Sequence, residues 1–217
     1  MNVTIIGAGN MGRGIGYRMI EGGHTVRVID SDHEKSQKLA SELNSAARNG
    51  ASVVASNIET SDLGDVVVLA LPYGMNKEVV RQLGNKLEDR IVVDIANPLN
   101  ATFDGLQTDS GTSSAEEVAA LVPQSTPVVK AFNTTFASTL VAGHVAGIPL
   151  DVLLAGNSSV AKTTVAQLVR DGGLVPVDTG SLSRARELES VGLLVIGLQS
   201  VQNYGFASGI KIISPNL

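Results

Sequence analysis

The chain has no cysteine and no tryptophan, and only three of its 217 residues are histidines. The absence of cysteine excludes disulfides, thiol catalysis and thiolate metal sites. None of the histidines (His24, His33 and His144) lies at metal-ligand spacing from another, so we expect no metal centre. The chemistry must therefore come from other side chains or from a bound organic cofactor.

Charge and long apolar runs are also sparse. Charged residues make up 17% of the chain, the net charge is −5, and no basic cluster occurs. This composition disfavours nucleic-acid and anionic-membrane partners. The late apolar run at 191–198 is far shorter than the ~20 residues that cross a bilayer, and the N-terminus lacks the basic start of a signal peptide. We expect a soluble, cytoplasmic protein with a small-molecule partner.

What the chain does contain is a regular alternation of strand and helix patterns. Apolar β-branched runs predict strands at 3–6, 25–29, 51–55, 66–71, 91–95, 126–130, 152–155 and 174–177. Helices are predicted at 10–21, 34–48, 77–87, 114–121, 160–171 and 183–201. This alternation indicates an α/β fold of the Rossmann type, with a doubly wound, mostly parallel sheet. We expect a dinucleotide-binding domain over 1–180 and a small helical appendage over 181–217.

The clearest motif is a glycine loop near the N-terminus. Gly7, Gly9 and Gly12 form a G-x-G-x-x-G pattern between a predicted strand and a predicted helix. The first glycine permits a tight turn, the second lets the backbone approach a pyrophosphate, and the third lets the helix pack on the strand. The pyrophosphate then lies at the positive end of the helix. The loop predicts a dinucleotide, and nicotinamide and flavin nucleotides both remain possible.

Asp30 ends the second predicted strand. A carboxylate at this position accepts hydrogen bonds from the adenine ribose and repels a 2′-phosphate. Ser31 follows, and no arginine lies close behind it. The pattern therefore favours NAD over NADP, with His33 and Lys35 as alternative contacts for a phosphate.

Amide side chains follow two later strands. The strands that end near Leu71, Asn97 and Asn133 should meet at the carboxyl edge of the sheet, where open α/β sheets bind ligands. Asn97 and Asn133 are therefore candidates for holding a nicotinamide carboxamide or an acceptor ring. The alternatives are a turn residue before Pro98 for Asn97 and a helix N-cap for Asn133.

The last predicted helix has two features of interest. We predict Ser183 as its N-cap and place Glu187 and Glu189 on or near a solvated face, with Arg184 and Arg186 either solvated or facing an anionic acceptor tail. An apolar stripe beyond them indicates single-chain core or a homodimer face. Its members are Leu188, Val191, Val195 and Leu198. Gly192 and Gly197 interrupt the stripe and indicate close approach by another backbone or a ligand.

Several longer stretches are similar to a known family. These are IIGAGNMGRGI, VVDIANP, SSAEEVAALVP, VVKAFNT, GLVPVDTGSLSRARELE and SGIKI. They resemble the NADPH-dependent reductases of the deazaflavin coenzyme F420 and the cytosolic reductase domain of six-transmembrane metalloreductases. The resemblance implies a Rossmann domain whose short C-terminal portion helps to form an acceptor pocket. It also implies hydride transfer between a nicotinamide nucleotide and a flavin-like ring.

The resemblance, together with the motifs above, gives a set of candidate site residues. Those expected at the cofactor are Gly7, Gly9, Asn10, Met11, Gly12, Asp30, Ser31, Leu71, Pro72, Asn97, Pro98, Ala131 and Asn133. Those expected at the acceptor are Asn133, Thr134 and Gly192. Hydride transfer depends on positioning rather than on a nucleophile, so Asn133 is the single candidate for a catalytic role.

The chain departs from the family pattern at three places. Asp30 and Ser31 stand where the family usually has a Ser-Arg pair that binds the 2′-phosphate. Asn133 replaces a histidine of the deazaflavin reductases, whereas the metalloreductase domains have asparagine there. Gly192 corresponds to a threonine of the deazaflavin pocket. A flavin is therefore as consistent an acceptor as the deazaflavin.

We expect an NAD(P)-dependent oxidoreductase with a flavin-like acceptor. A non-catalytic NAD(H)-binding sensor is the alternative, because the sequence shows no clear proton donor. An imine or hydroxy acid reductase ranks third, since such enzymes usually carry a large helical C-terminal domain. The sequence leaves a homodimer possible.

Overall fold

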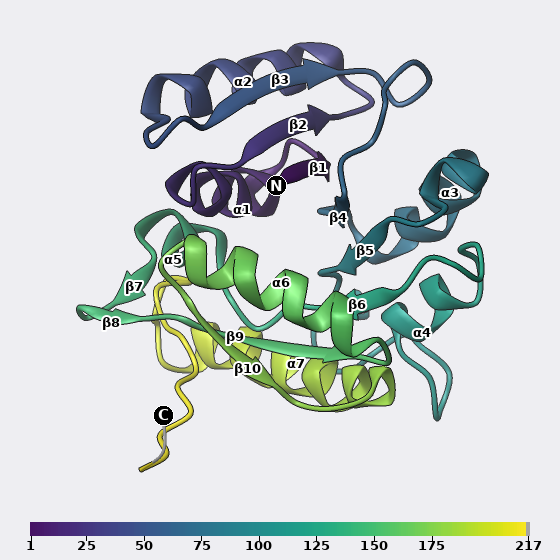
Figure 1. The fold of residues 1–217 in the computed structure, drawn as a ribbon. Helices are drawn as coiled ribbons and strands as arrows, with labels where there is room; N and C mark the ends of the chain where they lie inside the picture. Colours follow the sequence, from purple (N-terminus) through teal and green to yellow (C-terminus); the bar gives the residue numbers. More distant parts are fainter. Residues whose placement is uncertain (216–217) are drawn as a thin grey trace.

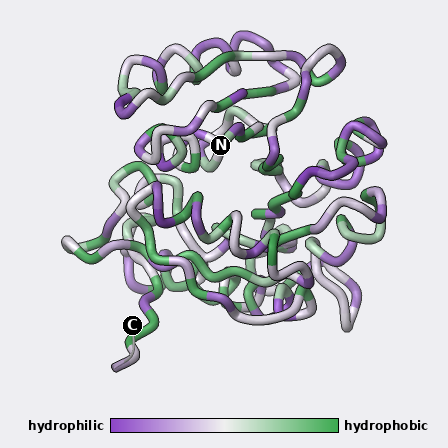
Figure 2. Tube along the Cα trace, viewed as in Figure 1, coloured by the Kyte–Doolittle hydropathy of each residue, from purple (hydrophilic) through white to green (hydrophobic). Residues whose placement is uncertain are grey.

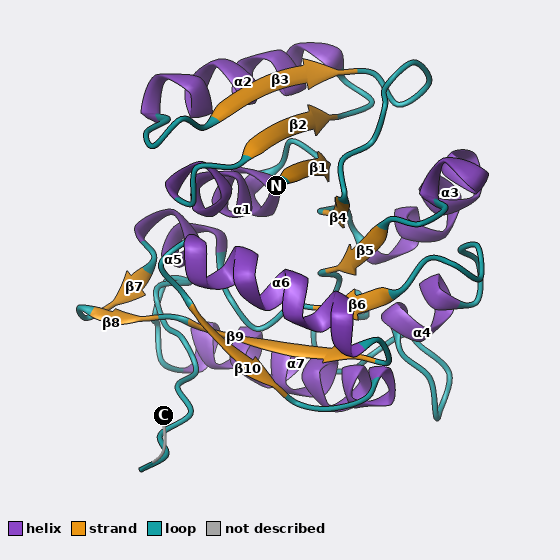
Figure 3. Cartoon of the chain, in the orientation of Figure 1, coloured by secondary structure: helices purple, strands orange, loops and turns teal. Residues whose placement is uncertain are grey.

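In the computed structural model, which describes residues 1–215, a single eight-stranded sheet with flanking helices forms the fold (Figures 1 and 3). The strand order is β10-β9-β6-β5-β4-β1-β2-β3. Six adjacent strands form a continuous parallel block: β1 (Asn2–Ile6), β2 (Thr25–Ile29), β3 (Ser52–Ser56), β4 (Val66–Leu69), β5 (Ile91–Asp94) and β6 (Val128–Lys130). The predicted Rossmann-type, mostly parallel sheet is confirmed. The last two residues of the predicted appendage, 216 and 217, lie outside the described part.

Seven α-helices occur within the described residues. They are α1 (Asn10–Glu21), α2 (His33–Ala46), α3 (Tyr73–Leu83), α4 (Ser114–Ala119), α5 (Ala137–Ala142), α6 (Ser159–Asp171) and α7 (Ala185–Val201). Two 3-10 turns, η1 (Gly84–Leu87) and η2 (Leu182–Arg184), precede β5 and α7. None of the helices within 1–215 is long and apolar enough to cross a membrane.

The sheet is buried on both faces, as the unbroken apolar runs predict. Alternate residues of β4 enter different hydrophobic clusters: Val66 and Val68 join one, and Val67 and Leu69 join the other. All four are at most 2% exposed. Figure 2 shows the hydrophobic stretches along these inner strands. The rigid double-sided core fixes the strand ends at which the loops of the site begin.

The second half of the sheet departs from the parallel pattern. β9 (Asp151–Gly156) runs antiparallel to β6, and β10 (Val175–Asp178) runs parallel to β9. A long crossover helix is missing between β6 and β9. The chain returns instead through the six-residue α5 and a hairpin of β7 (His144–Val145) and β8 (Ile148–Pro149), none of which we predicted. These elements are too short to show a helix or strand period.

Side-chain caps differ between the helix starts. The Ser113 side chain accepts a hydrogen bond from the Glu116 backbone N–H at 3.2 Å and so caps the start of α4. The prediction of Ser183 as an N-cap was wrong. Ser183 lies inside η2, and α7 begins at Ala185 without a side-chain cap. The 3-10 turn leads directly into the helix, so no extended residue precedes it to act as a cap.

Candidate functional site

The sheet order reverses between β1 and β4, and two adjoining cavities open there. β1 pairs with β2 on one side and with β4 on the other, so their carboxyl-end loops diverge. The larger cavity measures about 1030 Å³ and the smaller about 520 Å³. Both are lined by Gly9, Ala70, Leu71 and Pro72. Such a switch point is where doubly wound sheets bind ligands.

The glycine loop at this point has the geometry of a pyrophosphate cradle. Gly7 has φ +110°, and a Cβ there would collide with the Ala70 carbonyl oxygen. A Cβ on Gly12 would collide with the Gly7 carbonyl oxygen. Gly9 is different, because nothing lies within 4 Å of the place where its Cβ would be. It precedes α1 without a side-chain cap, and the first two residues of the helix, Asn10 and Met11, line the larger cavity.

The smaller cavity is acidic. Its charged or titratable lining residues are Asp30, His33 and Glu59, and no lysine or arginine lines it within the described chain. One Asp30 oxygen accepts from the Ala8 backbone N–H at 2.7 Å, and the other accepts from the Asp32 N–H at 2.9 Å. These two bonds hold the carboxylate at the end of β2, beside the glycine loop.

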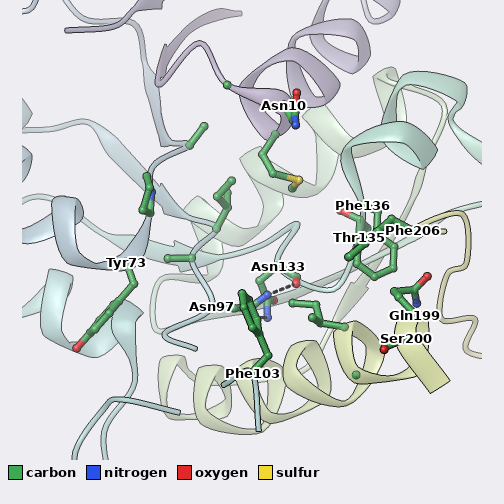
Figure 4. A pocket seen from close by; sticks show the side chains of 18 of the residues that line it. Asn10, Tyr73, Asn97, Phe103, Asn133, Thr135, Phe136, Gln199, Ser200 and Phe206 are labelled. Carbon is green, nitrogen blue, oxygen red and sulfur yellow. Dashed lines mark hydrogen bonds between the residues drawn. The ribbon is translucent and has the colours of Figure 1, made fainter. Parts of the chain in front are cut away.

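The larger cavity is apolar and uncharged. Three parts of the chain form it: the start of α1 with the loop after β4, the loops after β5 and β6, and the segment from α7 onward (Figure 4). Its lining residues are Gly9, Asn10, Met11, Ala70, Leu71, Pro72, Tyr73, Ile95, Ala96, Asn97, Thr102, Phe103, Asn133, Thr135, Phe136, Ile196, Gly197, Gln199, Ser200, Asn203, Gly205 and Phe206. No carboxylate, lysine, arginine or histidine occurs in this set. Its polar groups are amides, hydroxyls and backbone.

Asn97 and Asn133 meet on the floor of this cavity. The Asn97 Nδ2 donates to the Asn133 backbone carbonyl at 2.7 Å, and the Asn133 Nδ2 donates to Asn97 Oδ1 at 2.9 Å (Figure 4). The Asn133 Nδ2 also donates to the Leu188 carbonyl of α7 at 2.8 Å. Asn133 is not a helix N-cap, because Phe136 precedes α5. The pair joins the β5 and β6 loops to α7.

A buried ionic cluster lies three residues earlier on each of these strands. The Lys130 ammonium donates to Asp94 at 2.8 Å, to Glu189 at 2.7 Å and to the Ala96 carbonyl, and all three charged side chains are fully buried. Burial raises the pKa of the Glu189 carboxyl. Our placement of Glu189 on or near a solvated face was wrong. The helix period shows which residues of α7 share a face, but not whether that face is exposed. Here the face that carries Glu189 is buried against Lys130, which lies 59 positions earlier in the sequence.

The two arginines near the start of α7 have carboxylate partners. Arg184 lies 3.2 Å from Glu187, and Arg186 donates to both oxygens of Glu116 at 2.9 and 2.6 Å. Neither arginine lines the larger cavity. They form surface ion pairs in this structure.

Ten of the predicted site residues line one cavity or both. They are Gly7, Gly9, Asn10, Met11, Asp30, Ser31, Leu71, Pro72, Asn97 and Asn133. Five others do not: Gly12, Pro98, Ala131, Thr134 and Gly192. All five are buried. Gly192 lies against the Asn97 amide, which a Cβ would overlap, so its role is to let α7 approach the β5 loop.

Sequence reasoning missed the aromatic lining. Four of the seven aromatic residues in the chain line the larger cavity: Tyr73, Phe103, Phe136 and Phe206. Tyr73 donates to Glu117 at 2.8 Å, and burial together with this bond raises the pKa of its phenol. The low aromatic content could have indicated these residues. In a chain with so few aromatic side chains, one that lies in a loop is a candidate for ligand contact.

Comparison with known proteins gives a consistent family. Residues 2–98 match the family model described as "NADP oxidoreductase coenzyme F420-dependent". The F420-dependent NADP reductase of Methanothermobacter thermautotrophicus is 30% identical, over 98% of this chain and 94% of that protein. Metalloreductase STEAP3 of Rattus norvegicus is also 30% identical, over 89% of this chain, but the match spans only 37% of its own length.

A solved structure supports the same relationship. A putative F420-dependent NADP reductase from Arthrobacter sp. FB24 superposes with a TM-score of 0.79 at 27% identity, covering 98% of this chain and 99% of that one. The resemblance found in the sequence is therefore confirmed over nearly the whole chain. The chain is an oxidoreductase that belongs to the coenzyme F420-dependent NADP oxidoreductase family.

Proposed function

We propose that this chain transfers a hydride between a nicotinamide nucleotide and a flavin-like acceptor, either a flavin or the deazaflavin F420. The observation that carries the proposal is the pair of cavities that adjoin at Gly9 and at Leu71–Pro72. The smaller cavity suits an adenosine, and the larger has room for a nicotinamide and a second planar ring. The nucleotide supplies the hydride chemistry when bound, and the protein supplies position.

The described residues fit that task. The open backbone at Gly9 and the uncapped start of α1 suit a pyrophosphate. The amides of Asn97 and Asn133 already hold one another, so they present fixed polar groups to the carboxamide of a nicotinamide. We assign Ser31 to the ribose side and Met11, Leu71 and Pro72 to the walls. Four buried residues that do not line the cavities hold the loops in place: Pro98, Ala131, Thr134 and Gly192.

We further propose that NADH is preferred over NADPH. Asp30 is held by two backbone N–H groups at the rim of a cavity that has a second acid, Glu59, and no lining lysine or arginine. A 2′-phosphate placed beside Asp30 would meet like charge. The named relatives are NADP reductases, so this preference would distinguish the chain from them.

The test compares both nucleotides in binding and turnover. NADH should bind at least about tenfold more tightly than NADPH, since tenfold corresponds to about 1.4 kcal/mol of repulsion. Asp30→Ser combined with Ser31→Arg should reverse the order. Glu34→Gln, which removes a nearby acid that lines neither cavity, should leave it unchanged. Equal affinities in the native protein would refute the preference.

Turnover separates the enzyme from the sensor. NADH oxidation should follow when riboflavin, FMN or the deazaflavin is added. Tight NADH binding with no oxidation by any of the three would favour the non-catalytic sensor.

We also propose that residues from 181 onward complete the acceptor half of the site and that α7 forms a homodimer face. Leu188 packs with Leu153 and Ala155 of β9, so the helix is joined to the sheet. Its outer side leaves Leu194 62% and Val201 76% exposed. An apolar helix face of this kind is typical of a subunit interface.

A further inference from the structure

Phe103 and Phe206 stand out among the residues of the larger cavity. Both line it, yet their side chains are 59% and 52% exposed. A large apolar side chain left in water gains little from the folded state. Neither residue is therefore explained by core packing, although Phe206 also makes an edge contact with Phe136, with ring centroids 5.3 Å apart.

The backbone of both residues is also unusual. Phe103 and Phe206 each have φ +58°, in the left-handed region that a bulky residue rarely adopts. Such conformations are unfavourable and persist only when the surroundings impose them, and they gather at ligand sites. At Phe206 the surroundings are visible, because the Ser138 hydroxyl donates to its carbonyl at 2.7 Å. At Phe103 the backbone N–H bonds to the Asn100 carbonyl in a tight turn.

The two rings come from unrelated parts of the chain. Phe103 lies in the loop between β5 and α4, and Phe206 lies beyond the end of α7. Figure 4 shows Phe103 on one part of the cavity wall and Phe206, with Phe136, on another. No charged side chain lines the cavity between them, so a ligand there is held by stacking, apolar contact and hydrogen bonds rather than by ion pairs.

We propose that Phe103 and Phe206 bind the planar ring of the hydride acceptor and hold it against the nucleotide-binding half of the site. The proposal rests on the proposed function, because it takes the larger cavity to be the acceptor site. Aromatic side chains attract other flat rings in offset or edge-on geometry, whatever the substituents of the ring. Two such side chains at the mouth of the cavity would fix the plane of the acceptor, and hydride transfer depends on that plane.

The experiment uses the full chain and riboflavin, a flavin ring with an uncharged tail. The variants are Phe103→Leu, Phe206→Leu and the double variant, with Phe103→Tyr as the conservative change. Val160→Ala serves as the control, because Val160 is 74% exposed on α6 and lines neither cavity. Riboflavin binding is followed by quenching of its fluorescence, NADH binding by titration, and turnover by NADH oxidation.

Each leucine variant should weaken riboflavin binding and raise its KM about fivefold, from the usual strength of one aromatic pair. The double variant should exceed tenfold, and Phe103→Tyr and Val160→Ala should match the native chain. NADH binding should not change in any of them. A riboflavin KM and affinity that are unchanged in the double variant would overturn the proposal.

The two proposals can fail separately. If riboflavin binds and the leucine variants weaken it, but NADH is never oxidised, the ring site stands and the proposed function falls. If NADH is oxidised with the same riboflavin KM in every variant, the function stands and the ring site falls. If riboflavin neither binds nor reacts, the ring site falls, and the proposed function falls with it only when FMN and the deazaflavin also leave NADH unoxidised.

Stability gives an independent readout. Phe103→Gly removes the strain of a left-handed phenylalanine, so the midpoint of thermal unfolding should rise while riboflavin binding weakens. A phenylalanine with a purely structural role would give a lower unfolding midpoint together with unchanged riboflavin binding. That combined outcome would also overturn the proposal.

Discussion

Replacing Lys130 by methionine should destabilise the fold, and by an amount that depends on pH. Methionine approximates the length of the lysine stem but carries no charge. The substitution removes the only cation in contact with Asp94 and Glu189 within the described structure, and both carboxylates are fully buried. It also removes the donor to the Ala96 carbonyl, at the point where the β5 strand enters the loop of the site.

The magnitude follows from the cost of an uncompensated buried charge. Removing one partner of a buried ion pair typically costs about 3–5 kcal/mol. Whole domains are stable by only about 5–15 kcal/mol, so the variant should retain a fold but with a large loss. With a urea slope of about 3 kcal/mol per molar, the midpoint should fall by about 1–2 M. Glu189→Gln is the milder comparison, because Lys130 and Asp94 remain paired and the cluster becomes neutral.

The pH dependence has a definite sign. Burial raises the pKa of Glu189, while the nearby Lys130 lowers it. A raised pKa means that the folded state binds more protons than the unfolded state over the interval above the usual glutamate value of 4.5. Stability therefore falls as the pH rises through that interval. Without Lys130 the pKa of Glu189 rises further. The loss of stability with rising pH should therefore be larger in Lys130→Met, and it should disappear in Glu189→Gln.

Urea unfolding at pH 5 and pH 8, followed by circular dichroism, measures this directly. The difference in unfolding free energy between the native chain and Lys130→Met should be larger at pH 8 than at pH 5. A loss below about 1 kcal/mol at both values would mean that the cluster is not held as a buried charge network. An equal loss at both values would refute the role assigned to the Glu189 proton.

Two further predictions concern the glycine loop and the α7 face. Gly12→Ala should abolish tight NADH binding and lower the unfolding midpoint, because its Cβ would collide with the Gly7 carbonyl; calorimetry and a binding titration check this, and native-like binding would contradict it. Leu194→Asp should convert a dimer into a monomer in sedimentation analysis, because it places a charge on the exposed apolar side of α7, and an identical mass for both proteins would argue against that interface.

The first half of the fold was predictable because local patterns decide it. The glycine loop, β2 and the apolar run of β4 each carry their own period or turn chemistry, and α1 was predicted at its observed bounds, Asn10–Glu21. The direction of β9 was not predictable. It depends on α5 packing against α1, where Gly14 leaves space for Ala137 and Leu140. Such a contact joins segments more than a hundred positions apart, and no local pattern records it.

The site divides in the same way. Asp30 and Asn97 were found because each follows a strand, and the carboxyl ends of parallel strands share one edge. Phe103 and Phe206 follow no such rule, since one lies in a turn-rich loop and the other beyond the last helix. Lys130 was missed for a different reason. It is the last residue of β6, after two valines, and its burial depends on two distant carboxylates and the Ala96 carbonyl.

The two cavities differ in charge, and the difference matches the parts of the ligands that each would hold. The acidic Asp30 and Glu59 border the smaller cavity, where hydroxyl groups of a ribose would donate to carboxylates. The larger cavity has no charged lining side chain, and its polar lining includes the mutually bonded amides of Asn97 and Asn133. In such surroundings a neutral ring loses little solvation on entry, whereas a charged group would lose much. Hydride transfer needs two rings in contact without intervening water, so an uncharged chamber with aromatic walls suits the proposed reaction better than a polar one would.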